Sequence, residues 1–172
     1  MPVTHTLIQT VTVGAGGAAS IAFTSIPGTY TDLKLVLSTR SSAGVNAWSD
    51  YVVSFNSTST SVNWSGRALY GTGSAVVSSS FTNAYLGVGE GNGGTSSVFG
   101  NTEFYIPNYA SSNNKSVSVD SVSENNATSS LATLVAGLWS NTAAITSISI
   151  TDFNGGNFVQ YSSASLYGIK NS

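Results

Sequence analysis

The chain of 172 residues has the length of a single domain and is long enough to bury a sizeable hydrophobic core. Its formal net charge of -2, without any basic cluster, excludes the electrostatic footprint of a nucleic-acid-binding protein, and the absence of cysteine excludes disulfides and thiolate metal sites. No apolar run approaches the roughly 20 residues of a membrane-spanning helix, and the N-terminal residues lack the pattern of a secretory leader, so we expect a soluble, unprocessed protein without membrane attachment.

The polar surface of the protein is expected to be nearly uncharged. Charged residues make up 7% of the chain, against roughly 25% in typical soluble domains, and Ser, Thr, Asn and Gly take their place. The mean hydropathy is therefore only +0.14. Because a free monomer usually relies on charge for solubility, this composition favours a subunit of a larger assembly.

The first expected strand runs from Thr4 to Val13 and is rich in Thr and Val. Strict alternation would place Leu7 and Val11 on one face and Ile8 on the other. Residues 1–13 are alternatively an N-terminal arm, or a strand that is swapped between copies of the chain.

The clearest pattern lies in residues 20–40, where two runs alternate between apolar and polar side chains and predict strands at about 18–24 and 32–40. Between them, Pro27 removes a backbone donor and Gly28 can adopt a positive φ, so the hydrogen-bonded ladder must break there. The apolar side of the second run is expected to belong to the core: Leu33, Leu35 and Leu37.

Residues 56–80 are the least patterned part of the chain, and we expect a long, partly irregular excursion there. Long insertions of this kind in compact domains commonly carry function, which makes this one a candidate contact surface. An ordinary surface loop with hydrophobic anchors is the alternative.

The rest of the chain predicts further strands and no substantial helix. The glycine-dense segment 89–94 is read as a flexible connection, because a strand follows it where a phosphate-binding loop would open a helix. The segment 131–139 is apolar enough for the middle of a sheet. The expected strands include 51–55, 81–88, 98–106, 115–122, 131–139, 144–151 and 158–170.

These patterns together predict one all-β domain that spans residues 1–172. About eight to eleven short strands, separated by turn signals, are typical of an antiparallel β-sandwich, and we favour a jelly-roll-like arrangement. The edges of such sheets pair readily with other chains when they carry little charge, which again favours an oligomer.

No constellation of catalytic residues stands out. The chain has a single histidine, His5, which lies near the N-terminus, and its carboxylates are scattered singly, as solvated loop or edge residues would be. We therefore predict that the protein is not an enzyme and holds no metal or other cofactor.

The aromatic residues are the strongest candidates for a binding role. Trp48, Trp64 and Tyr70 are predicted as contacts to a partner or to a glycan, because a sugar site combines an apolar aromatic face with a polar rim. The alternative is that these side chains fill the core of the sandwich or an interface between subunits.

Three stretches of the chain together resemble a known group of proteins. They are IPGTYTDLKLVLSTR at 26–40, TEFYIPNYASSNNKSV at 102–117 and LWSNTAAITSISITDFNGGNFVQYSSASLYGI at 138–169, which ends in the LYGI strand. As a set they resemble small β-sandwich structural proteins that tailed bacteriophages encode. Residues 56–90 show no such resemblance.

The resemblance implies a virion protein that is built as a jelly roll and is commonly trimeric. It favours a capsid decoration (cement) protein that assembles in the cytoplasm of the host bacterium and binds the outside of the head as a homotrimer. Its partners are then the major capsid protein or other virion proteins. The alternative is a receptor-binding module of a tail or head fibre that recognises host surface carbohydrate.

Overall fold

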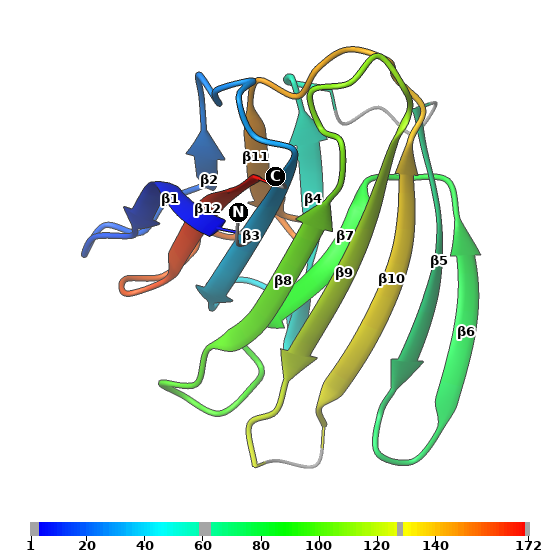
Figure 1. Ribbon diagram of the computed structural model, residues 1–172. Coiled ribbons are helices and arrows are strands. Elements are labelled where there is room, and N and C mark those ends of the chain that lie inside the picture. Colours follow the sequence, from blue (N-terminus) through cyan, green and yellow to red (C-terminus); the bar gives the residue numbers. More distant parts are fainter. Residues whose placement is uncertain (1–3, 59–62, 127–128, 171–172) are drawn as a thin grey trace.

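Figure 1 shows a computed structural model of the chain, which describes residues 4–58, 63–126 and 129–170. The described residues form twelve strands. They contain no helix that is long and apolar enough to cross a membrane. The strands are Thr4–Thr12 (β1), Ser20–Phe23 (β2), Asp32–Thr39 (β3), Trp48–Phe55 (β4), Trp64–Gly71 (β5), Val76–Phe81 (β6), Tyr85–Glu90 (β7), Gly100–Ile106 (β8), Lys115–Ser123 (β9), Leu131–Trp139 (β10), Ile148–Asp152 (β11) and Ser163–Lys170 (β12).

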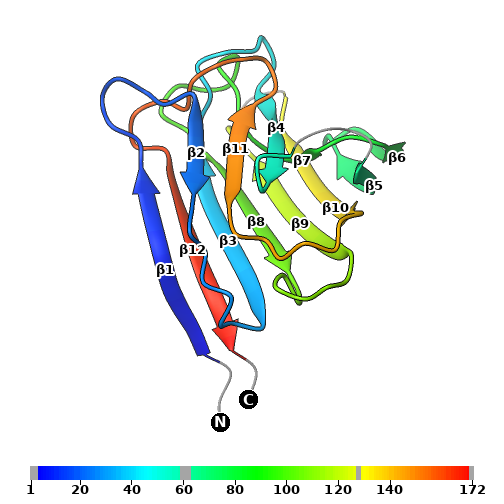
Figure 2. The same ribbon diagram turned by 90° about the horizontal axis from the view of Figure 1, so that it is seen from above.

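The strands form two antiparallel sheets that pack face to face as a sandwich (Figure 2). The larger sheet has eight strands in the order β1-β12-β3-β8-β9-β10-β5-β6, and the smaller has four in the order β2-β11-β4-β7. The prediction of an all-β antiparallel sandwich is confirmed. The segment 131–139 also lies where it was expected, because β10 pairs with β9 on one side and β5 on the other.

The connectivity is that of a jelly roll with two added hairpins. The chain crosses from one sheet to the other between β1 and β2, and continues to alternate through β3 and β4. Without β5-β6 and β9-β10, two four-stranded sheets remain, β1-β12-β3-β8 and β2-β11-β4-β7, as in a jelly roll. The two hairpins both widen the larger sheet, so β5 and β6 project beyond the smaller one (Figure 2).

The core fills the space between the two sheets. Leu33, Leu35 and Leu37 are buried as predicted, and each contributes about 1.5–3 kcal/mol when it leaves water. An aromatic cluster closes the core toward β5, where the ring of Phe55 lies 5.1 Å from that of Trp64 and 5.4 Å from that of Trp139. Strands β9 and β10 alternate strictly between buried and exposed side chains, since one face of each packs on this core.

The first strand departs from strict alternation. β1 pairs along its length with β12 of the same chain, but the register shifts between Leu7 and Gln9, so that Ile8 lies in a bulge. Leu7 is consequently 54% exposed, whereas Ile8 and Val11 pack against the core. The prediction that Leu7 shares a face with Val11 was wrong because a bulge shifts the alternation by one residue.

The structure adds detail to two expected connections. Residues 56–80, expected as a partly irregular excursion, contain β5 and most of β6; residues 59–62 lie outside the described part. The ladder breaks around Pro27-Gly28 as expected, and the two strands that flank this turn belong to different sheets. Ser25, with φ of 55°, adopts a positive φ, and Gly28 does not.

The three stretches that carry the sequence resemblance meet at one corner of the sandwich. The hydroxyl of Tyr109 donates a hydrogen bond to the carbonyl of Pro27. The buried carboxylate of Asp32 accepts hydrogen bonds from the hydroxyl of Tyr105, at 2.6 Å, and from the backbone N–H of Asn108, at 2.9 Å. These residues of the first two stretches therefore have structural roles.

The third stretch joins the same corner through Gly168, the glycine of the LYGI strand. The ring of Tyr30 lies so close to this glycine that a Cβ there would come within 2.3 Å of the ring. Only glycine leaves room for the ring, so the LYGI ending and the first stretch are packed against each other. The resemblance is thus carried by residues that hold the scaffold together.

Candidate functional site

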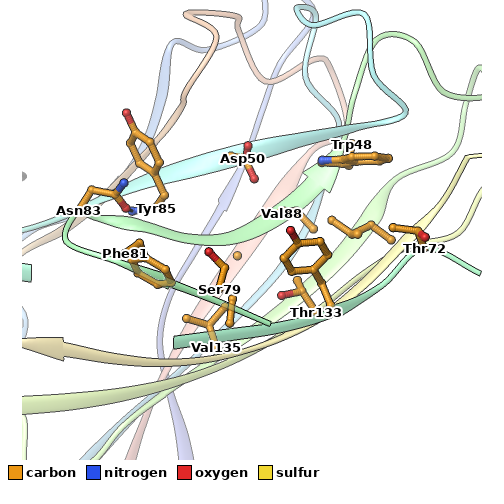
Figure 3. A pocket seen from close by; sticks show the side chains of 14 residues that line it. Trp48, Asp50, Thr72, Ser79, Phe81, Asn83, Tyr85, Val88, Thr133 and Val135 are labelled. Atoms are coloured by element: carbon orange, nitrogen blue, oxygen red, sulfur yellow. Dashed lines mark hydrogen bonds between the residues drawn. The ribbon is translucent and has the colours of Figure 1, made fainter. Parts of the chain in front are cut away.

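The widening of the larger sheet creates a groove. It has a volume of about 310 Å³ and lies between edge strand β7 and the overhanging strands β10, β5 and β6 (Figure 3). Its floor includes Thr133 and Val135 of β10, and one wall includes Ser79 and Phe81 of β6. The groove is therefore a direct consequence of the two hairpins that this chain adds to the jelly roll.

The opposite wall of the groove is formed from β4 and β7. Along β4, Tyr51 and Phe55 point into the core, so the alternate residues Trp48 and Asp50 lie on the other face of the strand. Both line the groove (Figure 3), and their positions on the strand are roughly 7 Å apart. Each side chain is only partly buried, so both remain accessible to a ligand.

The remaining aromatic residues of the groove come from β5 and β7. Tyr70 of β5 lines it from the overhang, and Tyr85 lies at the start of β7. The ring of Tyr85 packs against that of Phe153, with 4.5 Å between their centroids, and its backbone N–H donates to the side chain of Asn83 at 3.1 Å. These contacts fix one end of the groove.

Asp50 is the one charged residue among the described residues that line the groove. Its carboxylate makes no hydrogen bond within the described part of the chain, and its pKa is raised, first by burial and then by the nearby carboxylate of Asp152. Asp152 itself is held firmly, because it accepts hydrogen bonds from Ser49, at 2.5 Å, and from the backbone N–H of Asn154, at 2.6 Å. Of these two carboxylates, Asp50 is thus the one without a hydrogen bond from the described residues.

The raised pKa of Asp50 predicts a specific pH dependence. The carboxyl of Asp50 ionises less readily in the folded than in the unfolded protein. The free energy of unfolding therefore falls as pH rises from the ordinary pKa of this carboxyl, 3.8, through its raised pKa in the folded protein. Asp50→Asn removes this loss, so the variant should gain stability relative to the wild type between about pH 4 and about pH 7. Urea unfolding at the two pH values measures the difference. The other titratable groups near Asp50 are Asp152, Tyr70 and Tyr85. If the free-energy difference between variant and wild type is the same at the two pH values, the prediction is contradicted.

The groove brings together two of the three aromatic residues that the sequence singled out. Trp48 and Tyr70 both line it, but Trp64 is 2% exposed and packs against Phe55 and Trp139 in the core. As a contact to a partner or glycan, Trp64 is therefore a wrong prediction. Sequence reasoning also missed Asp50, although its place two residues after Trp48 on a strand puts both on one face.

The carboxylates are less solvated than expected. Asp32, Glu90 and Asp152 are at most 5% exposed, and each is bound by neighbouring side chains or backbone groups. They serve as buried anchors of loops and strand ends. Within residues 4–58, 63–126 and 129–170, no group of three or more His, Cys, Asp or Glu side chains is placed to hold a metal ion.

A second surface lies on the opposite side of the larger sheet. We call it the outer face and define it by the outward side chains of β9, β10 and β5. Leu69 and Leu134 are cross-strand partners at its centre and are 48% and 56% exposed. Val122 and Leu138 extend the apolar surface, with 42% and 36% exposure.

Charge on the outer face is limited to one acidic and one basic side chain. Asp120 of β9 is the cross-strand partner of Leu134, and Arg67 of β5 lies two residues from Leu69. Within the described residues, neither Asp120 nor Arg67 has an ion-pair partner, and the guanidinium of Arg67 donates a hydrogen bond to the carbonyl of Gly66, at 3.0 Å. The outer face therefore offers an apolar centre with one free cation and one free anion beside it.

Among the described residues, the groove and the outer face are thus two candidate surfaces for binding another molecule. Comparison of the chain with protein-family models, with curated proteins and with solved structures finds no match in any of the three.

Proposed function

We propose that the protein is a structural component of a bacteriophage virion, a decoration (cement) protein that binds the outside of the assembled head as a homotrimer and stabilises it. The observation that carries this proposal is the outer face, where leucine side chains about half exposed lie on a broad sheet with very little charge. Contiguous apolar surface of this kind marks sites of protein–protein contact. The resemblance of the sequence to structural proteins of tailed bacteriophages is the reason for proposing a phage head as the binding partner.

The proposed mechanism is thermodynamic. A protein that binds only the assembled head stabilises it by mass action, by about 2.7 kcal/mol when the free protein is at 100 times its dissociation constant. The many Ser, Thr and Asn side chains suit a hydrogen-bonded, partly hydrated interface around an apolar centre. No chemical step is needed for this role.

Leu134→Glu should abolish the stabilisation of heads without unfolding the protein, because the side chain is 56% exposed and buries little within the chain. The measurement is the temperature at which heads assembled from the major capsid protein of the same phage release their contents, with and without added protein. Wild-type protein should raise this temperature, and Leu134→Glu should not.

The matched control is Val45→Glu, which introduces the same charge at a residue that is 94% exposed and lies outside the outer face. It should stabilise heads as the wild type does. Light scattering of the purified protein should give three times the mass of the 17.6 kDa chain. Failure of the wild type to bind heads, or equal protection by Leu134→Glu, would contradict the proposal.

One observation, the groove, favours a second candidate function. A receptor-binding module of a tail or head fibre would need a site for host surface carbohydrate, and the groove holds the partly exposed Trp48 and Tyr70 that such a site requires. Substitutions can test head binding and sugar binding separately, because the outer face and the groove lie on opposite faces of the larger sheet.

A further inference from the structure

We propose that the groove between β7 and the overhang of β10, β5 and β6 binds a neutral pyranose sugar, which stacks on Trp48 and donates hydroxyl hydrogen bonds to Asp50. The inference deepens the second candidate function by naming the class of ligand. It rests on the groove alone and does not depend on the outer face or on a place in the virion.

Trp48 supplies the apolar platform. One face of a pyranose ring presents C–H groups, and an indole offers the largest flat apolar surface for them to cover. Of the three tryptophans, Trp64 and Trp139 are at most 2% exposed, whereas Trp48 is only partly buried and lines the groove. Trp48 is also not part of the core cluster, so the packing of the sandwich does not explain its position.

Asp50 supplies the hydrogen-bond acceptor. An ionised carboxylate accepts but does not donate, and its two oxygens match the two hydroxyl donors that neighbouring sugar carbons present. Bonds of this kind to a charged acceptor are shorter and stronger than those between neutral groups. In the protein alone, Asp50 lies partly buried beside Asp152 without a hydrogen bond in the described part of the chain, so a ligand with hydroxyl donors would relieve it.

The charge of the groove selects against anionic ligands. No Lys, Arg or His is among the described residues that line it, and Asp50 would repel phosphate, sulfate or carboxylate groups. Thr72, Ser79 and Asn83 instead offer neutral groups that can donate to or accept from sugar hydroxyls. The volume of about 310 Å³ lies at the small end of the range for ligand pockets, which favours a short saccharide segment.

Within the described residues, Trp48 lies outside the core cluster and the carboxylate of Asp50 makes no hydrogen bond or ion pair. A partly exposed indole and a partly buried carboxylate without a hydrogen bond are positions at which substitution commonly raises stability, and proteins retain such costs where function requires them. This argues that the pair is kept for what it binds.

The test is binding of the full chain to an array of neutral oligosaccharides built from glucose, galactose, mannose and N-acetylglucosamine, beside their phosphorylated and sialylated counterparts. The best neutral ligand is then titrated while tryptophan fluorescence is recorded. Since Trp64 and Trp139 are buried, the fluorescence change should report on Trp48. Because Trp48→Ala lacks this reporter, the variants are compared with the wild type by calorimetric titration. Trp48→Ala should weaken binding at least about tenfold, equivalent to about 1.4 kcal/mol, and Asp50→Asn should weaken it while leaving the groove its shape.

Two further variants make the outcome decisive. Tyr161→Ala removes an aromatic side chain that is 72% exposed outside the groove, and it should bind the sugar as the wild type does. Leu134→Glu should also keep sugar binding, which separates this test from the test of the proposed function. The inference is overturned if no neutral sugar binds saturably, if Trp48→Ala binds as the wild type does, or if the anionic glycans bind better than the neutral ones.

Discussion

Arg40→Met is expected to lower the free energy of unfolding by about 3–5 kcal/mol, because it leaves a buried carboxylate without its cation and a loop without its donors. The carboxylate is that of Glu90, which is fully buried and lies 3.9 Å from the guanidinium. Glu90 also accepts hydrogen bonds from Ser123, at 2.6 Å, and from Asn125, at 2.9 Å, which hold it in place but supply no positive charge.

The guanidinium of Arg40 also holds the loop that follows β7. It donates to four backbone carbonyls, at distances from 2.7 to 3.3 Å, and these carbonyls belong to Asn92, Gly94, Thr95 and Val98. Methionine fills a similar space but offers none of these donors. The carbonyls would then need water, which the packing around a side chain only 11% exposed does not readily admit.

Urea or thermal unfolding of the purified variant measures the loss. Lys34→Met is the matched control, since the pair of Lys34 and Glu103, at 2.9 Å, is 29% and 46% exposed and should contribute no more than about 1 kcal/mol. The double variant Arg40→Met with Glu90→Gln should recover part of the loss, because the uncompensated charge is then gone. A loss for Arg40→Met as small as that for Lys34→Met would contradict the account.

The loop held by Arg40 shows where sequence reasoning stops. The glycines of 89–94 indicated a flexible connection, yet Gly93 lies so near the carbonyl oxygen of Val45 that a Cβ would come within 2.1 Å of it. Here glycine permits close packing against backbone. Arg40 lies far from this loop in the sequence, so no local pattern could reveal that its side chain fixes the loop.

Most strands could be predicted because alternation is a local signal. β9 buries every second side chain, and the alternation of Val117 and Val119 with serine displays that period in the sequence. β10 has the same burial pattern, but it was predicted from its run of apolar residues. β6 was missed for the opposite reason: nearly all of its side chains are exposed in the overhang, so VVSSSF has no buried face to impose a period. The order of the strands in the sheets depends on contacts between distant segments and carries no local signal.

The candidate site was predictable only in part. Aromatic residues can serve a core or a binding surface, and the sequence does not distinguish Trp48 from Trp64. The register does, since Trp64 pairs with Trp139 on the inward face of the larger sheet, whereas Trp48 alternates with the inward Tyr51 of β4. Asp50 escaped notice because its significance depends on the groove, which exists only once β5 and β6 extend the sheet.

Gly168→Ala is expected to lower the free energy of unfolding by about 3 kcal/mol, the upper part of the usual range for overpacking. The added methyl group would come within 2.3 Å of the base of the Tyr30 ring, and that ring packs against the core. The ring cannot yield by a small movement, because the contact lies next to its own attachment point. It must leave its position and give up its packing.

The control and the partner variant decide whether this contact is the cause. Gly28→Ala should be neutral or slightly stabilising, by up to about 1 kcal/mol, because nothing lies within 4 Å of the added group and φ of Gly28 is not positive. In a Tyr30→Ala background, Gly168→Ala should cost little, and the difference between the two backgrounds is the coupling energy. If the losses of free energy from Gly168→Ala and Tyr30→Ala simply add, the destabilisation by alanine arises within β12 and not from the contact with Tyr30. Strong coupling would mean that Gly168 in the LYGI ending must remain a glycine because the ring of Tyr30 in the IPGTY stretch occupies the space of a side chain.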